Sequence, residues 1–330
     1  MQSVTINQNQ ANQRLDKFLK KYLPEAGSSF LYKMLRKKNI TLNGKKAEGK
    51  EMLAVGDTLC FFFSEETFAK FAGNQSKDNT HSYKQAYQKY PNISILYEDD
   101  HIVMLNKPAG VLTQKAQPDD LSLNEWLIGY LLHTNAITPQ ILQTFHPSVC
   151  NRLDRNTSGI VLCGKSLKGS QELSRIIKER SLGKFYHTIC VGSIREKASL
   201  QGYLYKDNQT NKVTVIAKAQ DNASPIQTSY IPLSCNPQYT LLEVELHTGK
   251  THQIRAHLAS IGHPIIGDFK YGNPKTNQIL QQEYHLSSQL LHAYRVVFPH
   301  MEGVLAPLSG KEFIAPYPSL FDQMKKVLQL

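Results

Sequence analysis

The sequence predicts an α+β protein, with a small basic N-terminal module followed by a larger domain rich in strands. Three observations support this. The 330 residues exceed one average domain of roughly 100–200 residues. A polar segment, residues 64–91, separates two stretches of different texture. Beyond it, strand patterns outnumber helix patterns and do not alternate strictly with them, which favours a mixed α+β domain over a doubly wound one.

Composition and charge narrow the class of protein. The chain has 41% hydrophobic and 20% charged residues, as ordinary globular proteins do. Its net charge is +11, and residues 1–63, with eleven Lys or Arg against five Asp or Glu, carry six of these charges. This asymmetry favours a polyanionic partner, with nucleic acid ahead of a membrane surface. No apolar run approaches the ~20 residues of a membrane helix, so we expect a cytoplasmic protein without a membrane partner.

The N-terminal module, residues 12–63, contains signals for two helices and a hairpin. An apolar stripe at helical spacing over residues 14–23 predicts an amphipathic helix. Ser28 or Ser29 is expected to cap a second helix, whose outer face is basic: Lys33, Arg36, Lys37 and Lys38. Residues 40–42 followed by Asn43-Gly44 predict a hairpin, and a strand is expected at 58–63.

Residues 64–91 are polar and without sustained periodicity, apart from a possible helical turn near 83–90, and are interpreted as a linker. The second domain, residues 92–330, then follows. Its predicted strands lie near 95–97, 102–105, 160–163, 185–191, 213–217, 241–246 and 291–298. Its predicted helices lie near 123–132, 166–180 and 251–260.

The segment Asn151-Arg152-Leu153-Asp154-Arg155 is the strongest candidate for chemistry, because it places one carboxylate between two guanidiniums at the head of an apolar run. Nearby Arg residues favour the ionised carboxylate, which can act as a nucleophile or a base. The alternative is ordinary: most sequences of this kind form solvated ion pairs of little energetic value.

The segment 247–258 combines a turn, a helix and clustered polar residues. Thr251 is expected to cap the helix, which would place Gln253 and Arg255 near its N-terminus, where anions are favoured. His252 and His257 are separated by five residues, and this spacing turns their rings to different helix faces, unlike the i, i+4 pair of H-E-x-x-H. We therefore expect no metal site. The five scattered cysteines, which include no C-x-x-C pair, predict neither a disulfide framework nor a zinc-thiolate site.

Two resemblances bring these signals together. The order of elements in residues 12–63 resembles the S4 RNA-binding domain. Residues 93–318 resemble the RluA family of RNA pseudouridine synthases, whose H-R-L-D-R-x-T-S-G signature is matched from Arg152 to Gly159. Further matches are the K-x-Y element at 184–186, the T-G-R-T-H-Q-I-R-x-H-L element at 248–258 and the G-H-P-I-x-G-D-x-x-Y-G element at 262–272. Two positions depart from the family: Asn151 replaces the usual His and Lys250 the usual Arg. For Asn151 we expect altered RNA contacts and retained activity.

The resemblance implies the fold, a mixed, mostly antiparallel sheet of the pseudouridine synthase type. It also implies the roles. Asp154 would act as nucleophile or base, Arg255 would pair with it, and Tyr186 would stack on the uracil near the proton that moves. Arg152 would fill the gap left by the flipped nucleotide. The candidate catalytic residues are thus Asp154, Tyr186 and Arg255, and the candidate RNA or substrate contacts are Arg152, Arg155, Lys107, Lys184, Lys250 and Gln253.

The resulting expectation is a monomeric enzyme, with no obligate protein partner, that isomerises uridine in structured RNA, foremost 23S ribosomal RNA or its precursor, without cofactor or metal. One alternative is a non-catalytic RNA-binding or ribosome-assembly factor. The retained Asp154, Tyr186 and Arg255 disfavour it, because binding alone has no need of a carboxylate that faces a phosphate polymer. A metal-dependent nuclease would need clustered carboxylates, and the motifs supply only Asp154 and Asp268.

Overall fold

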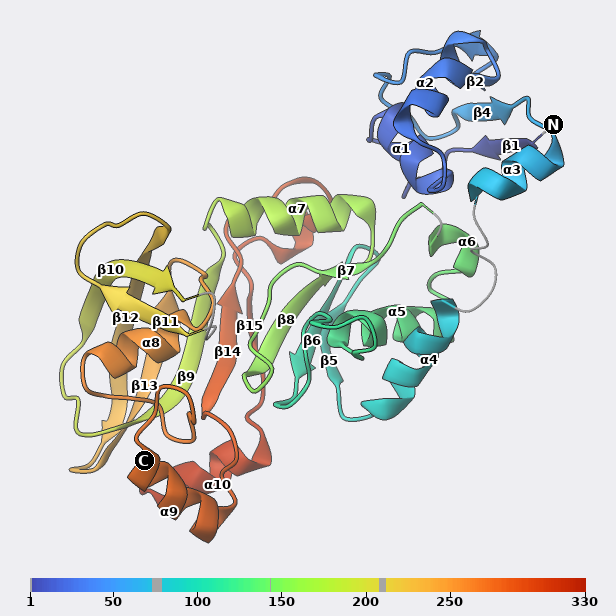
Figure 1. The fold of residues 1–330 in the computed structure, drawn as a ribbon. Helices are drawn as coiled ribbons and strands as arrows, with labels where there is room; N and C mark the ends of the chain where they lie inside the picture. The colour runs from blue at the N-terminus through green and yellow to red at the C-terminus, as the bar shows by residue number, and fades with distance from the viewer. Residues whose placement is uncertain (1, 73–78, 143, 208–211) are drawn as a thin grey trace. The chain divides into compact units, whose positions relative to one another are not determined.

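The computed structural model describes residues 2–72, 79–142, 144–207 and 212–330, and it divides into two compact units (Figure 1). The first comprises Met1–Pro91, Asn124–Ser148 and Lys165–Lys168, and the second comprises Asn92–Leu123, Val149–Gly164 and Gly169–Leu330. Each unit is described separately below.

The first unit is built around a small antiparallel sheet in the order β1-β4-β2-β3. Its elements are β1 (Gln2–Thr5), α1 (Leu15–Tyr22), α2 (Ser28–Arg36), β2 (Ile40–Leu42), β3 (Lys45–Lys46) and β4 (Thr58–Phe61). Both predicted helices are confirmed, and so is the hairpin, whose Asn43 and Gly44 have φ values of 51° and 72°. The predicted serine cap is wrong, because α2 begins at Ser28 after Gly27 and has no side-chain cap. Strand β1 was not predicted.

The segment interpreted as a linker contains two helices, α3 (Glu65–Ala72) and α4 (Asn79–Lys89). Phe68 and Phe71 of α3 pack on the aromatic core of the small sheet. Helix α4 packs on α5 (Leu123–His133) so closely that a Cβ added to Gly129 would lie 2.2 Å from the carbonyl oxygen of Tyr83. A short helix α6 (Pro139–Leu142) completes this unit. The helical turn predicted near 83–90 falls within α4 apart from its last residue, whereas α3 and the full length of α4 were missed. Helix α4 is polar and has no strong apolar stripe. The boundaries at residues 63 and 91 stay predictions.

The second unit holds a sheet of eleven strands within the described residues, in the order β11-β10-β12-β13-β9-β14-β8-β6-β5, with β15 beside β14 and β7 beside β8. The pairs β11–β10, β10–β12, β12–β13, β13–β9, β9–β14, β14–β15, β8–β6 and β6–β5 are antiparallel, and β14 with β8 is parallel, so the predicted mixed, mostly antiparallel sheet is confirmed. The strands are β5 (Ser94–Glu98), β6 (Ile102–Lys107), β7 (Ser148–Val149), β8 (Ser158–Gly164), β9 (Gly183–Val191), β10 (Ala198–Lys206), β11 (Val213–Ile216), β12 (Ala223–Cys235), β13 (Tyr239–Leu246), β14 (Leu291–Val297) and β15 (Glu312–Ile314).

Strands β10 and β12 were not predicted from the sequence. Strand β12 contains Pro225 and Pro232, and proline lowers the expectation of a strand because it donates no hydrogen bond to the ladder. The ladder of β12 with β13 shifts its register between Pro232 and Ser234, as at a β-bulge. Both strands alternate between more and less exposed residues, as a sheet with one solvated face does.

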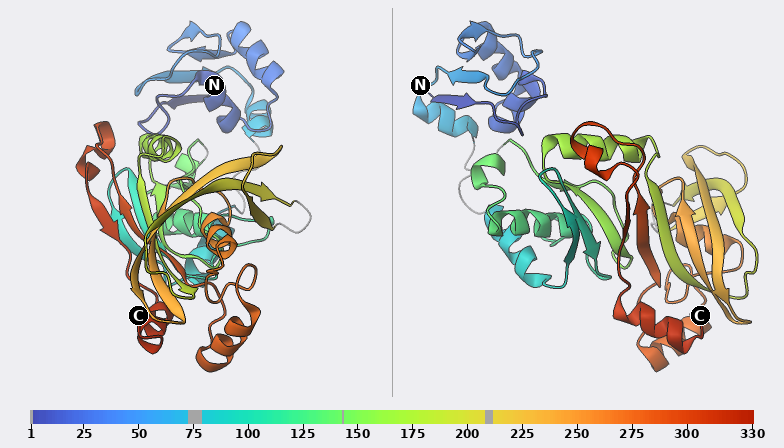
Figure 2. Two further views of the ribbon diagram at one scale, coloured as in Figure 1. Left: turned by 90° about the vertical axis from the view of Figure 1, so that its left-hand side faces the viewer. Right: turned by 180° about the vertical axis from the view of Figure 1, so that it is seen from behind.

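The helices of the second unit are α7 (Leu167–Lys178), α8 (Gln253–Ser260), α9 (Pro274–Tyr284) and α10 (Ser319–Val327), with a 3₁₀ turn at Gly303–Leu308. Helix α8 lies against strands β11 and β12 (Figures 1 and 2). Because side chains alternate along a strand, β9 presents Tyr186 on one face and His187 on the other. The loop before β8, the middle of β9, the start of β14 and the N-terminus of α8 together form the site described next.

Candidate active site

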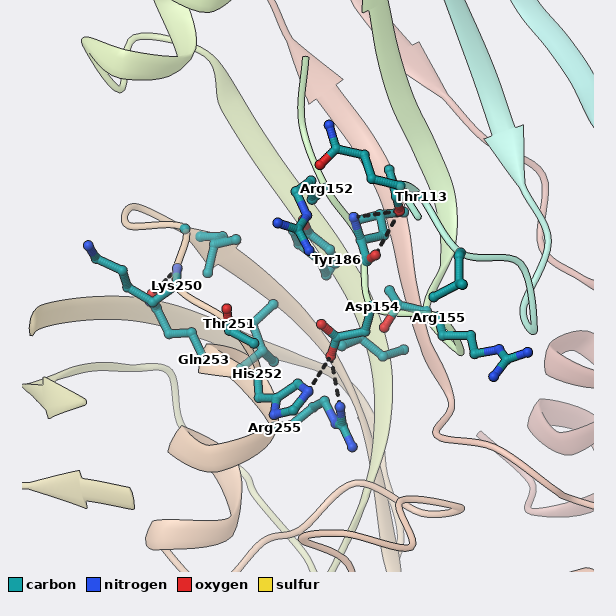
Figure 3. Close-up of a pocket in the computed structure, with 18 residues that line it drawn as sticks. Thr113, Arg152, Asp154, Arg155, Tyr186, Lys250, Thr251, His252, Gln253 and Arg255 are labelled. Carbon is teal, nitrogen blue, oxygen red and sulfur yellow. Dashed lines mark hydrogen bonds and ion pairs between the residues drawn. The ribbon is translucent and has the colours of Figure 1, made fainter. Parts of the chain in front are cut away.

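The second unit contains a cavity of about 420 Å³, within the roughly 300–1,000 Å³ typical of small-molecule sites. Figure 3 shows it with Asp154 at its centre, Tyr186 and Arg152 on one side, and Arg255 and His252 on the other. These residues come from three separate segments of the chain, so the fold brings together residues more than a hundred positions apart. Asp154 and Arg255, for example, are separated by 101 positions.

Two hydrogen bonds fix the backbone next to Asp154. The Thr113 hydroxyl donates to the carbonyl oxygen of Leu153 at 2.7 Å, and the Leu153 N–H donates back to that hydroxyl at 3.2 Å. The Thr157 N–H donates to the carbonyl oxygen of Asp154. These bonds hold the loop, so the Asp154 side chain, 23% exposed, projects into the cavity (Figure 3).

Arg255 connects two carboxylates. Its Nη1 donates to Oδ2 of Asp154 at 2.8 Å, while its Nε and Nη2 donate to Asp268 at 2.7 and 2.9 Å. Asp268 is fully buried and also accepts from the N–H groups of Lys270 and Tyr271. Burial alone would raise the pKa of Asp268, but the guanidinium and these N–H groups lower it below its ordinary value. Arg255 is therefore oriented by Asp268 and presents one N–H to Asp154.

Arg255 shares its N–H donors between Asp268 and Asp154, and only one oxygen of Asp154 is bonded to it. The other oxygen therefore stays available. Among the described residues, Oδ2 receives the hydrogen bond from Arg255, and no hydrogen-bond donor contacts Oδ1. A carboxylate held by one oxygen keeps its orientation while the other oxygen remains open to a ligand. This geometry suits a nucleophile.

Tyr186 lies in the wall of the same cavity. The side chain is buried, and burial, followed by the charge of Asp154, raises the pKa of its hydroxyl well above the ordinary value. It is therefore a neutral phenol at physiological pH. The ring offers an apolar face for stacking, as the sequence analysis expected. Arg152 is exposed at the rim on the same side (Figure 3).

His252, one of the histidines for which the sequence predicts no metal site, also lines the cavity. It precedes α8 with a φ of 56°, and no side chain caps the helix, so the predicted Thr251 cap is wrong. The Nε2 atom of His252 lies 3.8 Å from Oδ2 of Asp154, and its Nδ1 is hydrogen-bonded to the Tyr271 hydroxyl at 2.9 Å. The T-H-Q-I-R motif placed His252 near Arg255 in sequence, but nothing in the sequence revealed the left-handed backbone that turns the ring to Asp154.

Gln253 was predicted to contact RNA, and its environment argues against this. The side chain is 2% exposed. Its oxygen accepts from Thr248 and from the Lys250 N–H, and its nitrogen donates to the Gln227 carbonyl oxygen and to Thr228. Because all these bonds are internal, Gln253 braces the turn before α8. Lys250, by contrast, is exposed and lines the cavity, and its contact with RNA or substrate stays a prediction.

Lys107 also lies elsewhere than predicted. It is fully buried, and its Nζ donates to the carbonyl oxygens of Pro108, Val111 and Arg155 at 2.8–3.0 Å. Burial lowers the pKa of Lys107 to about 7, whereas three carbonyl acceptors require three N–H donors, which only the ammonium form has. We therefore assign the charged form. All three donors are used, so Lys107 fastens the Asp154 loop and leaves no donor for RNA.

Of the remaining two predicted contacts, Arg155 is among the residues that line the cavity and Lys184 is not. Arg155 is exposed, and its guanidinium points away from Asp154 (Figure 3) while its Nε donates to the carbonyl oxygen of Gly110. Lys184 is half-buried, with its Nζ close to Gly249 in the turn before α8. Burial, and then Arg180, lower the pKa of Lys184. Both side chains lie within the same unit as the cavity.

Asn151, which replaces the usual His, is tied to the sheet. Its side-chain oxygen accepts from the Leu162 N–H at 2.7 Å, and its nitrogen donates to the Ile160 carbonyl oxygen at 3.3 Å. The amide thus joins the loop to β8. Altered RNA contacts at this position stay a prediction.

The histidines of the 247–263 region have separate partners. His257 contacts Thr228, and His263 contacts the Val191 carbonyl oxygen. Across the described ranges, no three His, Cys, Asp or Glu side chains are grouped so that they could hold a metal ion. Within the same ranges, no helix is long and apolar enough to cross a membrane.

Comparisons with known proteins agree with this geometry. Residues 101–260 match the family model of RNA pseudouridylate synthase. The chain is 30% identical over 318 residues to "Ribosomal large subunit pseudouridine synthase C" of Vibrio parahaemolyticus, covering 94% of each chain. It is 29% identical over 333 residues to the Vibrio vulnificus protein of the same name, covering 100% of this chain and 96% of that protein. A human structure, "RNA Pseudouridylate Synthase Domain Containing 4", shares the fold with a TM-score of 0.59 at 19% identity, covering 76% of this chain and 97% of that one.

By these relatives the chain is an RNA-modifying isomerase. The chain belongs to the RluA family of RNA pseudouridine synthases.

Proposed function

We propose that this enzyme converts uridine to pseudouridine in large-subunit ribosomal RNA, with Asp154 as the reacting carboxylate and no cofactor. The observation that carries the proposal is the contact between Asp154 and Arg255 inside a cavity bordered by Tyr186. The reaction breaks the C1′–N1 bond and forms a C1′–C5 bond. The C5 proton is lost and N1 gains one, so atoms and electrons balance without a redox partner.

The arrangement supplies what each step needs. Asp154, anchored through Oδ2, directs Oδ1 toward C1′, where it forms an ester as the C1′–N1 bond breaks, as in retaining glycosidases. The ester breaks again when C5 of the turned uracil bonds to C1′, and the freed carboxylate takes the C5 proton. Removal of the C2′ proton to give a glycal is the alternative route. Tyr186 stacks on the uracil while the base turns. Its raised pKa keeps the hydroxyl protonated, so it donates a hydrogen bond to the freed uracil. Arg152, exposed at the rim, fills the place of the extruded nucleotide.

The ribosomal substrate is proposed from the relatives and from the charge of the first unit. Two relatives are named for the ribosomal large subunit. In the first unit, α2 and the residues after it present four exposed cations, Lys33, Arg36, Lys37 and Lys38. We assign this unit, in its residues 12–63, an S4-like role of gripping RNA phosphates, because clustered Lys and Arg neutralise phosphate charge.

The proposal is tested by mapping pseudouridines in total RNA from cells with the gene, without it, and with the Asp154→Asn variant. We expect one or more large-subunit uridines to lose the modification both without the gene and with Asp154→Asn. A matched control, Asp322→Asn at an exposed position of α10, is expected to restore it. Restoration by Asp154→Asn, or no change in ribosomal RNA on deletion, would refute the proposal.

A further inference from the structure

His252 lines the cavity but has no part in the steps proposed above. Its ring lies beside the reacting carboxylate, and the backbone φ of 56° fixes the direction in which it points. In Figure 3, His252 approaches Asp154 from the same side as Arg255. The group that His252 presents to a substrate depends on which ring nitrogen carries the proton.

A chain of hydrogen bonds sets this tautomer. The Tyr271 hydroxyl oxygen accepts from the Val213 N–H at 3.0 Å and lies 2.9 Å from Nδ1 of His252. The described residues offer the hydroxyl proton no other acceptor, so Tyr271 donates it to Nδ1. In neutral imidazole the proton is then on Nε2, the atom 3.8 Å from Asp154 Oδ2.

Burial also favours neutral imidazole, because it is the largest influence on the pKa of His252 and lowers it. Asp154 and Asp268 raise this pKa, whereas Arg255 and Lys270 lower it, and the net pKa lies below the ordinary value. The nearby Lys212 Nζ lies over the Tyr271 ring at 5.8 Å. His252 thus presents an uncharged N–H donor to the cavity at physiological pH.

The stereochemistry of uridine determines what meets this donor. The base and the 2′-hydroxyl lie on opposite faces of the ribose ring. A carboxylate that displaces the base approaches C1′ from the face opposite the base, which is the face that carries the 2′-hydroxyl. Groups next to the attacking oxygen of Asp154 therefore meet the 2′-oxygen.

We propose that His252, together with Asp154, binds the 2′-hydroxyl of the target nucleotide and so determines specificity for ribose. This inference rests on the proposed attack by Asp154. The separation of 3.8 Å between Nε2 and Oδ2 is too long for a direct hydrogen bond. It does allow one oxygen atom to sit about 2.8 Å from both, which is a normal hydrogen-bond length. A hydroxyl both donates and accepts, so the 2′-hydroxyl donates to Asp154 and accepts from His252.

A deoxyribose in this position leaves both groups without their partner. Sites built to bind a hydroxyl discriminate strongly against the analogue that lacks it, because their polar groups are left unpaired. The 2′-hydroxyl is also the group by which a protein distinguishes RNA from DNA at a given position. His252 thus adds substrate selection to a site whose chemistry depends on Asp154.

The test is a double-mutant cycle in which one change is made in the enzyme and the other in the substrate. The probe is a synthetic RNA hairpin carrying the uridine located by the mapping experiment, with either ribose or 2′-deoxyribose at that one nucleotide. The variants are His252→Asn, which tolerates the left-handed backbone but is too short to reach, and His252→Gln, whose longer amide places a donor near the former Nε2. Single-turnover rates are measured for each pair.

We expect the deoxy target to slow the wild-type enzyme at least tenfold, and His252→Asn to slow the ribose target by a similar factor. The two changes together should slow the reaction little more than either change alone. The rate of His252→Gln should be several-fold higher than that of His252→Asn on the ribose target, but not on the deoxy target. If the two factors multiply, His252 does not contact the 2′-oxygen and the inference is wrong. If the deoxy target does not react, dissociation constants in the Asp154→Asn background replace the rates, with the same criterion.

The experiment separates this inference from the proposed function. Failure of the wild-type enzyme to modify the ribose hairpin would count against the proposed function. Normal modification combined with independent effects of the two changes would count against the role of His252 alone.

Discussion

Arg255 gives two of its hydrogen bonds to the fully buried Asp268, at 2.7 and 2.9 Å. That contact determines how the guanidinium meets the cavity, because the remaining N–H then faces Asp154 at 2.8 Å. The orientation of the Asp154 carboxylate thus depends on a second, buried carboxylate.

The first prediction concerns Asp268→Asn. Breaking a buried ion pair typically costs about 3–5 kcal/mol, and because Arg255 keeps its contact with Asp154, the lower end of this range applies. We expect a loss of this size in the free energy of unfolding, measured by urea denaturation, and at least a tenfold fall in kcat with little change in RNA affinity. A matched control is Glu179→Gln, which breaks an exposed ion pair with Arg175 on α7 and should change stability by less than about 1 kcal/mol. Equal effects of the two substitutions would contradict this account.

The second prediction distinguishes the two roles considered for Lys107. If its Nζ only fastens the Asp154 loop through three carbonyls, Lys107→Met should lower kcat at least tenfold while the salt dependence of RNA binding stays unchanged. A lysine in contact with phosphate would instead reduce the slope of log K against log salt by roughly 0.7–0.9. Binding titrations between 50 and 200 mM salt, in the range where this effect is usually measured, decide between the two. A reduced slope would restore the RNA contact predicted from the sequence.

The third prediction is a pH dependence of stability that arises from His292. Its Nδ1 accepts from the Ser158 hydroxyl, its Nε2 donates to the Ala315 carbonyl oxygen, and burial lowers its pKa to about 4. The unfolded chain takes up a proton near pH 6.5 but the folded protein does not, so stability is full above pH 6.5 and falls as the pH drops toward 4. We expect the lowered pKa of His292 to reduce the free energy of unfolding by about 3 kcal/mol between pH 6.5 and pH 4.

The measurement for His292 compares unfolding by urea at pH 7 and pH 4.5 for the wild type and for His292→Gln. Gln cannot titrate, so the variant should lose less stability on acidification than the wild type. The difference between the two proteins isolates His292 from the carboxylates that titrate in the same range. A parallel decline of both would show that His292 does not contribute.

The fourth prediction tests the basic face of the first unit. Replacing Arg36, Lys37 and Lys38 by alanine should weaken RNA binding and lower its salt dependence. Each lost phosphate contact reduces the number of counterions that the RNA releases on binding. Single-turnover chemistry at saturating RNA should stay close to wild type. Replacing the exposed Lys178, Lys275 and Lys326 of the second unit is the matched control, with a smaller expected effect. If the alanine variant of the first unit binds RNA with unchanged affinity and unchanged salt dependence, these three residues do not contact RNA phosphates.

The sequence predicted which candidate residues share a cavity better than it predicted their surroundings. Its motifs pointed to Asp154, Tyr186 and Arg255, and the fold brings all three to one cavity. Motifs record residue types in order along the chain, so they indicate which side chains a site needs. They do not record exposure, and for this reason Lys107 and Gln253 were predicted at the RNA surface although both are buried.

The parts that were missed depend on tertiary contacts. The role of Asp268 follows from its contact with Arg255, and that of His252 from a left-handed residue before α8. Helix α4 has only a weak amphipathic pattern, and its packing depends on the close approach of Gly129 to Tyr83. Strand β12 was hidden by its two prolines and is held in the sheet by β10 and β13.

The most direct test of the central claim is the release of tritium from C5-labelled uridine in large-subunit ribosomal RNA by the Asp154→Asn variant. The account predicts no release above background, together with RNA affinity within about threefold of the wild type, because Asn preserves the shape of the side chain but not its charge. Tritium release at a rate close to that of the wild type would contradict the assignment of Asp154 as the reacting group.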